Sequence, residues 1–130
     1  MNNDYFKVIR GGLNSTFQDE GRKGLYHIGL PFSGVMDKRN YLIANKLNNN
    51  NENDAVLEFA YQGPLLKYFG KKRNLVITGD VSFKILKKDK SHDNGECYRT
   101  IEINDGDTID IISTNKSVYG YLSINGGFNL

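Results

Sequence analysis

Apolar and polar positions alternate in several short segments of this chain, and turn residues separate these segments. In segment 108–112, Ile109 and Ile111 fall on one face while Asp110 falls on the other, so Asp110 is expected at the surface. Segments of this kind, rich in β-branched and aromatic residues, predict β-strands. The predicted strands are 5–9, 55–61, 65–69, 75–78, 82–86, 98–103, 108–112 and 118–124.

Two connections between these segments carry local signals of their own. The pair Asp105-Gly106 supplies the residue types that a tight primed turn requires, which predicts that 98–103 and 108–112 pair as a hairpin. The asparagine-rich run 48–53 is biased in composition, and it is expected to form one exposed loop.

One segment has the pattern of a helix. Asp37 is suited to cap the first turn, and the helix is predicted to continue through 38–47 with Leu42, Ile43 and Leu47 toward the core. The chain of 130 residues shows no internal repeat and has room for one core. We therefore expect a single, mainly β domain with one or two short helices.

Composition and charge exclude several classes of function. Lys and Arg number 17 against 15 Asp and Glu, and the charges are spread along the chain, so no nucleic-acid footprint is predicted. No apolar run is long enough to cross a membrane, and the N-terminus has no apolar signal segment. The single cysteine, Cys97, lacks the Cys and His spacing of a metal site, so no metal and a cytoplasmic location are expected.

The densest group of polar and glycine residues lies in segment 15–24. Gln18, Asp19 and Arg22 offer an amide, a carboxylate and a guanidinium within one loop that is suited to a carboxylate or amide substrate. The alternative is that Asp19 pairs with Arg22 and only fixes the shape of the turn. The residues by themselves favour this structural interpretation.

A second candidate is the Ser33-Gly34 turn, which precedes the predicted helix. Backbone amides at a helix start suit an anion or a polarised carbonyl. The alternative, which the residues by themselves favour, is that Ser33 or Asp37 caps these amides without any ligand, although capping and ligand contact are compatible. Glu58 lies inside an apolar strand. If its face is buried, the carboxylate must be paired or have a raised pKa, and if its face is open it is an ordinary surface residue.

Other motifs are missing or uninformative. His27 and His92 have no spacing that suggests a catalytic triad or a metal site, and His92 is expected in a loop. No Walker loop or dinucleotide-binding motif is present. ATP binding by this chain alone is therefore not predicted.

Taken in order, the motifs 8–13, 16–24 and 29–37 resemble the opening of the biotin-dependent carboxyltransferase family, which includes the C-type subunit of 5-oxoprolinase, the Kip antagonist protein and urea amidolyase. The resemblance continues along the chain in the segments 44–45, 55–58, 63–64, 76–79 and 121–127. It implies a cyclophilin-like β-barrel, of which residues 1–130 form the N-terminal part. An incomplete barrel is expected to expose unpaired strand edges and apolar surface, and so to aggregate or to require a partner. One departure is Asp80, where the family commonly has a small residue after glycine, and this change is expected to alter a turn or a pocket wall.

The resemblance also implies function. In the 5-oxoprolinase branch, A-, B- and C-type subunits together use ATP to open 5-oxoproline to glutamate. In the urea amidolyase branch, the corresponding domain takes part in carboxyl transfer from carboxybiotin to urea, on the allophanate pathway. The chain itself is expected to bind no cofactor, to have homologous B-type and A-type partners, and to meet a small amide substrate. The alternatives are a non-catalytic regulatory module of the Kip antagonist type and a gene remnant.

The resemblance marks positions without assigning catalytic roles to them. The expected substrate-binding residues are Gln18, Asp19, Arg22, Ser33, Gly34, Asp37, Asn45 and Glu58.

Overall fold

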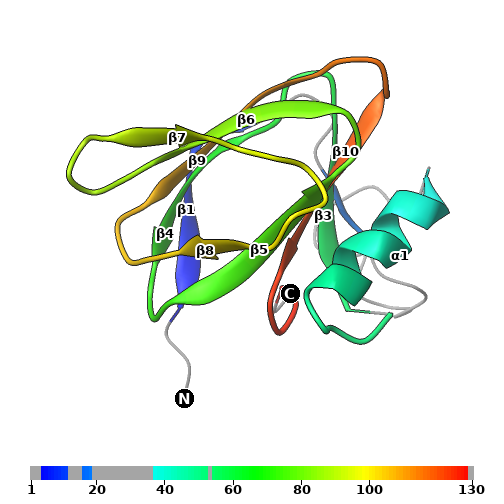
Figure 1. The fold of residues 1–130 in the computed structure, drawn as a ribbon, viewed down its shortest axis with the longest axis horizontal. Coiled ribbons are helices and arrows are strands. Elements are labelled where there is room, and N and C mark those ends of the chain that lie inside the picture. Colours follow the sequence, from blue (N-terminus) through cyan, green and yellow to red (C-terminus); the bar gives the residue numbers. More distant parts are fainter. Residues whose placement is uncertain (1–3, 12–15, 19–36, 53, 129–130) are drawn as a thin grey trace.

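The computed structural model of the chain describes residues 4–11, 16–18, 37–52 and 54–128, with only the backbone of 16–18, and these residues form ten strands and one helix (Figure 1). Helix α1 spans Lys38–Leu47. The strands are β1 (Tyr5–Arg10), β2 (Thr16–Gln18), β3 (Val56–Ala60), β4 (Leu65–Phe69), β5 (Arg73–Thr78), β6 (Val81–Leu86), β7 (His92–Asn94), β8 (Ile101–Ile103), β9 (Thr108–Thr114) and β10 (Tyr119–Ile124). The expected mainly β fold class with a short helix is confirmed.

The strands are arranged in two antiparallel sheets. One sheet has the order β1-β4-β9-β6-β7, and the other has the order β2-β3-β10-β5-β8. Strands that follow one another in the chain commonly lie in different sheets, as β3 and β4, β5 and β6, and β8 and β9 do. Each sheet is therefore built from segments that are distant in the sequence.

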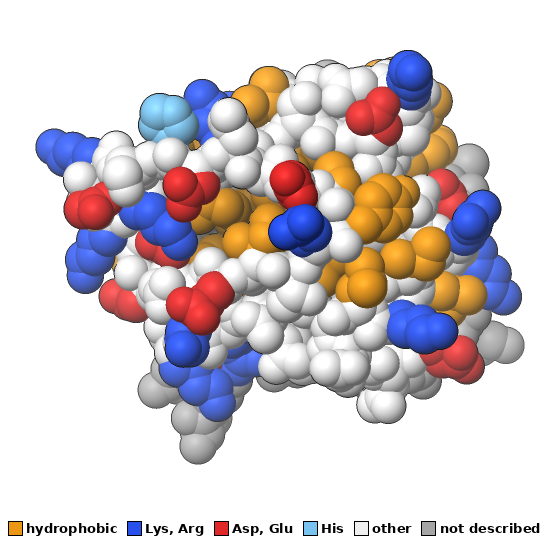
Figure 2. All heavy atoms as spheres, in the orientation of Figure 1, with side chains coloured by type: hydrophobic (Ala, Val, Ile, Leu, Met, Phe, Trp, Pro, Cys, Tyr) orange, Lys and Arg blue, Asp and Glu red, His pale blue; other side chains and the backbone are white. Residues whose placement is uncertain are grey.

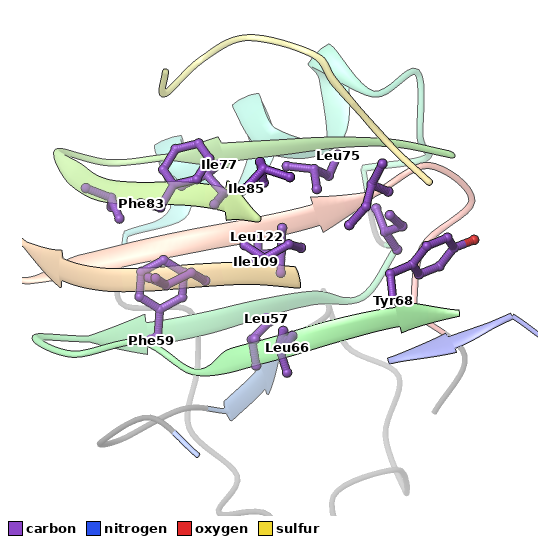
Figure 3. Packing of buried hydrophobic residues seen from close by; sticks show 14 residues of the cluster. Leu57, Phe59, Leu66, Tyr68, Leu75, Ile77, Phe83, Ile85, Ile109 and Leu122 are labelled. Atoms are coloured by element: carbon purple, nitrogen blue, oxygen red, sulfur yellow. The ribbon is translucent and has the colours of Figure 1, made fainter. Parts of the chain in front are cut away.

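The main core lies between the two sheets. Leu57 and Phe59 of β3 and Leu122 of β10 pack toward Leu66 and Ile109 of the opposite sheet (Figure 3). All of these side chains are buried, and they alternate along each strand with residues on the other face. Burial of such apolar surface is the main favourable contribution to folding.

Helix α1 covers the outer face of the β2-β3-β10-β5-β8 sheet. Tyr41 and Ala44 of the helix are fully buried against Val56 and Tyr121 of the sheet. The predicted start is confirmed, because a carboxylate oxygen of Asp37 accepts a hydrogen bond from the Asn40 N–H (3.2 Å).

The predicted buried face of this helix is wrong for Leu47 and only partly right for Leu42, which packs beside the buried residues. Leu47 is 39% exposed, and Leu42 and Ile43 are only partly buried. The helix instead turns Tyr41, Ala44 and Asn45 toward the sheet. The physical reason is that this face of the sheet carries polar side chains, which hydrogen-bond to the helix and its C-terminal loop. Leu42 packs partly against the small apolar cluster that Val56 and Tyr121 form there with the helix.

The predicted hairpin between 98–103 and 108–112 is also wrong. Strand β8 pairs with β5, whereas β9 pairs with β4 and β6, so the two segments belong to different sheets. The turn between them is closed by a hydrogen bond from the Asp107 N–H to the Asn104 carbonyl (3.0 Å). Only Gly106 of the central pair has a positive φ (85°), whereas a type I′ hairpin turn needs two such residues.

The sequence pattern also missed two short strands. Strand β2 pairs with β3, and strand β7 pairs with β6 through His92 and its two successors. His92 was expected in a loop, and it is instead paired with Leu86. Strand β7 has no apolar alternation because all three of its side chains are exposed.

Candidate functional site

A row of three buried polar residues crosses the sheet beneath α1. Tyr121 of the central strand β10 is in register with Glu58 of β3 on one side and with Thr78 of β5 on the other. Glu58 is 4% exposed, and the other two are fully buried. Buried polar groups are costly unless they are hydrogen-bonded, so the contacts of this row define the site.

Glu58 is joined to the start of α1 through Tyr121. The Tyr121 hydroxyl donates to Glu58 Oε2 at 2.5 Å, and the same hydroxyl oxygen accepts the Asp37 N–H at 2.8 Å. The sequence left the environment of Glu58 open, and the structure shows that it is buried and paired. Two positions that are 21 residues apart in the chain, Asp37 and Glu58, thus meet on one hydroxyl group.

The Tyr121 hydroxyl is held in its protonated form. Burial raises its pKa well above the ordinary value, and the hydrogen bond to the Glu58 carboxylate raises it further. The hydroxyl therefore remains a donor to Glu58 at any physiological pH. Its lone pairs remain available to the Asp37 amide.

The first turn of α1 is fixed from three directions by Asn40. Asn40 Nδ2 donates to Asp37 Oδ2 (2.7 Å), while Asn40 Oδ1 accepts from the Tyr98 hydroxyl (2.6 Å). The Asn40 carbonyl accepts from Thr78 Oγ1 (2.8 Å). Asn40 therefore orients the carboxylate of the capping residue Asp37. The helix start is held to β5 through Thr78 and to β10 through Tyr121.

Asn45 belongs to a different group of contacts. Its Nδ2 donates to the Asp54 carbonyl (2.9 Å), and its Oδ1 accepts from Asn50 Nδ2 (3.2 Å) and from Ser123 Oγ (3.3 Å). Asn45 is fully buried and lies on the side of α1 that faces the sheet. These contacts tie the end of α1 to β10, and they do not connect Asn45 to Glu58.

The asparagine loop is exposed at Asn49, Asn51 and Glu52, as expected, but it is not exposed at Asn48. Asn48 is only 2% exposed, and its Nδ2 donates to the carbonyl and to the hydroxyl of Ser123, both at 3.0 Å. Asn50 donates to the Ile124 carbonyl (2.8 Å) and accepts from the Gly126 N–H (2.8 Å). Asparagine suits these positions because one side chain both donates and accepts.

The other expected site residues are placed only in part. The backbone of Gln18 is paired with Val56 in the β2–β3 ladder, and Thr16 in the same ladder is paired with Glu58. Asp19, Arg22, Ser33 and Gly34 lie outside the described residues, as does the alternative Asp19 to Arg22 ion pair. The described residues therefore bring together Asp37, Glu58 and the backbone of β2.

Sequence reasoning missed Tyr121, which joins these positions. Tyr121 lies in a strand whose residues from Gly120 to Ile124 are all buried, so no alternation marks its face. The only available signal was a buried aromatic hydroxyl, which usually finds a polar partner. Thr78 and Asn40 were missed because the hydrogen bonds from Thr78 to Asn40 and from Tyr98 to Asn40 join positions that are distant in the sequence.

Asp80, the departure from the family pattern, belongs to a turn. Its carboxylate accepts hydrogen bonds from the Lys116 N–H (3.0 Å) and from Asn115 Nδ2 (3.3 Å), and these bonds hold its pKa below the ordinary value. The Asp80 N–H donates to Ser117 Oγ (2.9 Å). The acidic side chain therefore fixes the loop between β9 and β10.

A pocket of about 310 Å³ lies elsewhere, between β7 and β8. Ile85 and Ile101 contribute apolar surface to it, while Lys87, Glu96 and Arg99 contribute charge. Figure 2 shows apolar surface surrounded by charged side chains on this face of the molecule. Among the expected substrate-binding residues whose side chains the structure describes (Asp37, Asn45 and Glu58), none lines this pocket, so we place the candidate site at Glu58 and Tyr121.

No group of three or more His, Cys, Asp or Glu side chains within the described residues is arranged to hold a metal ion. In the same part of the chain, the helix is too short and too polar to span a bilayer.

Comparison with known proteins places these features in a family. The chain is 29% identical to the urea amidolyase of Lachancea kluyveri over 126 residues, which are 96% of this chain and 7% of that protein. It is 31% identical to the C-type subunit of 5-oxoprolinase from Haemophilus influenzae over 116 residues, which are 89% of this chain and 36% of that protein. The chain thus spans only a minor part of the length of these relatives.

The fold is shared with solved structures. The crystal structure of the Kluyveromyces lactis urea carboxylase superposes with a TM-score of 0.77 at 31% identity, covering 94% of this chain and 10% of that one. The family described as carboxyltransferase domain, subdomain A and B, matches residues 28–130. The two-sheet fold and this match agree, and the chain belongs to the carboxyltransferase domain family, subdomains A and B.

Proposed function

We propose that this chain is a component of a 5-oxoprolinase-type complex and corresponds to the N-terminal part of its C-type subunit. In this proposal it acts with homologous A- and B-type subunits in the cytoplasm to open 5-oxoproline to glutamate at the expense of ATP. The similarity to the C-type subunit of 5-oxoprolinase supports it. The observation that carries it is the hydrogen-bonded connection from Asp37 through Tyr121 to the buried carboxylate of Glu58.

The chemistry of a cyclic amide suits this arrangement. When the ring opens, the carbonyl oxygen gains negative charge, which fixed hydrogen-bond donors and the positive end of a helix dipole stabilise. The start of α1 offers such an environment, and Asp37 and Asn40 hold it in place. Glu58, oriented by Tyr121, would accept the amide N–H of the substrate or carry a proton during ring opening.

In this proposal ATP is bound by other chains of the complex, and carboxybiotin belongs only to the urea amidolyase branch. The sequence contains no glycine-rich phosphate loop. Gln18, Asp19, Arg22, Ser33, Gly34 and Asn45 remain proposed substrate-binding positions of the C-type subunit.

The test is reconstitution. The purified chain is mixed with the A- and B-type subunits of the Haemophilus influenzae enzyme in place of the C-type subunit of that enzyme, and glutamate formation from 5-oxoproline is measured with and without ATP. We expect activity only with all three chains and ATP. Glu58→Gln should lower kcat by about 100-fold or more, the usual contribution of a positioned acid or base.

A matched control distinguishes a catalytic role of Glu58 from the general effect of removing one negative charge. Glu102 lies on β8 with its side chain 55% exposed, so Glu102→Gln removes the same charge far from the site and should leave kcat unchanged. If the folded chain neither binds the two subunits nor restores activity with them, or if it is active and Glu58→Gln leaves kcat unchanged, the proposed role is wrong.

Carboxyl transfer to urea is the second candidate, because the similarity to urea amidolyase covers 96% of the chain. The same preparation is assayed with urea and a carboxybiotin donor instead of 5-oxoproline. Turnover of urea alone would move the chain to the urea branch. Tight binding to the B-type subunit without turnover of either amide would favour a regulatory module.

A further inference from the structure

The four described strands at the ends of the two sheets differ greatly as edges. Strands β7 and β8 have three residues each and carry charged side chains, which is how proteins commonly protect a sheet edge. Strand β1 has six residues, Tyr-Phe-Lys-Val-Ile-Arg, and pairs with β4 along one side only within the described residues. Strand β1 is therefore the long and mostly apolar edge.

The side chains of β1 leave apolar surface uncovered. Tyr5 is 57% exposed, Val8 is 61% exposed and Ile9 is 51% exposed. Val8 is in register with Leu66, so both side chains lie on the face that forms the core, yet Leu66 is only 4% exposed. The core face of the sheet thus continues to β1 and remains open at Val8.

The strand is nevertheless firmly held on its paired side. The Tyr5 ring stacks on Phe69 with 5.1 Å between ring centroids, and Arg10 Nη2 forms an ion pair with Asp110 Oδ1 at 3.1 Å. Phe6 packs partly buried against the main core. An edge that is already ordered loses little conformational entropy when another strand is added.

The charge on β1 selects the kind of strand that fits. Lys7 is directly opposite Lys67 of β4, and no carboxylate pairs with either lysine within the described part of the chain. If a second copy of the chain paired its β1 antiparallel with this β1, with the two Lys7 residues opposite each other, its own Lys7 and Lys67 would extend the row to four lysines. Like charges opposite each other are destabilising. A carboxylate at this position would instead be attracted by both lysines.

We propose that β1 is a docking edge for an extended segment of another protein, which adds as a further strand to the β1-β4-β9-β6-β7 sheet. The segment places a carboxylate opposite Lys7 and an apolar, β-branched side chain over Val8. Backbone hydrogen bonds provide affinity, and these two side chains provide selectivity. The interaction is independent of the chemistry proposed for Glu58.

The probes are capped peptides of about seven residues, the length of an ordinary strand, that alternate Thr and Val. One peptide has Glu at its centre, a second has Lys there, and a third is the Glu peptide with alternate backbone nitrogens methylated. Binding to the whole chain is followed by amide chemical shifts and by hydrogen exchange of the β1 amides. We expect the Glu peptide to bind about fivefold more tightly than the Lys peptide and the methylated peptide not to bind.

Two variants test the named residues, and one serves as a control. Lys7→Glu should reverse the preference between the Glu and Lys peptides, and Val8→Lys should weaken binding of the Glu peptide about tenfold. Ile112 is 42% exposed on β9, inside the same sheet, so Ile112→Lys adds the same charge away from the edge and should change nothing.

The proposal is overturned if the Glu and Lys peptides bind equally, or if backbone methylation has no effect. It is likewise overturned if Ile112→Lys weakens binding as much as Val8→Lys does. A concentration-dependent dimer that Val8→Lys abolishes would identify a second copy of the chain, and not an acidic segment, as the occupant.

Discussion

Glu58 illustrates how one buried charge can be both costly and useful. Removing a carboxylate from water is unfavourable by several kcal/mol unless hydrogen bonds replace the lost hydration. Tyr121 supplies such a bond, and Asp37 fixes the orientation of Tyr121 through its backbone amide. Because each group orients the next, the position of the helix start depends on a side chain in the middle of the sheet.

The first prediction concerns Tyr121→Phe, which removes only the hydroxyl. Glu58 then loses a donor and the Asp37 N–H loses an acceptor, so the free energy of unfolding should fall by about 1–3 kcal/mol at pH 7. Urea denaturation measures the change. Tyr61→Phe is the control because Tyr61 is 58% exposed, and it should alter stability by no more than about 0.5 kcal/mol. Equal effects of the two variants would contradict the role given to the hydroxyl.

The second prediction follows from the raised pKa of Tyr121. The pKa is above its ordinary value of 10.0 in the folded chain, so the hydroxyl contributes stability that is fully present below pH 10 and is lost as the pH rises further. The stability difference between wild type and Tyr121→Phe should therefore shrink above pH 10. Denaturation at several alkaline pH values measures it, and a constant difference would argue against a protonated donor.

The third prediction concerns Asp4, whose carboxylate forms an ion pair with Arg73 Nε at 2.8 Å. Partial burial opposes ionisation of Asp4, but hydrogen bonds from Arg73, the Lys71 N–H and Tyr68 outweigh it and hold the pKa below 3.8. The pair therefore stabilises the fold above pH 3.8, and this stability is lost as the pH falls through the lowered pKa. Asp4→Asn should be less stable than wild type at pH 7 and nearly equal to it in strong acid.

Acid titration of both proteins by circular dichroism checks this expectation. Glu102→Gln is the control, because the pair of Glu102 with Lys72 is exposed and contributes little at any pH. A stability gap for Asp4→Asn that persists unchanged into strong acid would mean that the carboxylate charge is not its source.

The candidate site was predictable only where a residue stands out against its neighbours. Glu58 is a charge within an apolar strand, and Asp37 precedes a helical pattern, so both were recognised from the sequence. Tyr121 is one apolar-looking residue among several buried ones, and its hydrogen bonds reach residues 63 and 84 positions away. Pairings over such separations depend on sheet order, which local patterns do not contain.

At the scale of elements, the bounds of α1 were predictable but its orientation was not. The cap at Asp37 and the following run define where the helix lies, whereas its buried face is chosen by the sheet beneath it. That sheet presents Glu58, Thr78 and Ser123, so the small side chain of Ala44 and the polar side chain of Asn45 face it. Hydrophobicity alone favoured the leucines.

The fourth prediction tests this orientation. Ala44→Leu inserts bulk where the helix meets the sheet and should lower the free energy of unfolding by about 1–3 kcal/mol through overpacking. Leu47→Ala removes a larger side chain that is 39% exposed and should cost about 0.5 kcal/mol or less. Thermal or urea unfolding of both variants measures these losses. A larger loss of stability for Leu47→Ala than for Ala44→Leu would mean that the face with the leucines is the buried one.

Most strands were predictable because alternation and turn residues mark them, and the exceptions share a cause. Strand β7 has three exposed side chains, so its identity rests entirely on backbone pairing with β6. The Asp105-Gly106 turn has the residues of a hairpin but carries the chain from one sheet to the other. A turn signal shows that the chain reverses direction, and it does not show which strands will pair.

At the scale of the whole molecule, both sheets share one apolar core. Phe59 of one sheet and Ile111 of the other belong to the same buried cluster, so neither sheet can lose its packing alone. The fifth prediction is that near-ultraviolet circular dichroism, from eight tyrosines and seven phenylalanines, and far-ultraviolet circular dichroism report one coincident thermal transition. Weak near-ultraviolet signal with retained strand content would instead indicate a loosely packed state.

The position of β10 has a consequence for the time at which the protein folds during synthesis. Strand β10 is the last described strand in sequence, yet it lies at the centre of its sheet, between β3 and β5. While a ribosome is still making the residues that precede β10, β3 and β5 have no strand to join them. This sheet therefore cannot form until β10 has been synthesised. Until Tyr121 has left the ribosome and can pair with Glu58, β3 and β5 remain accessible to chaperones.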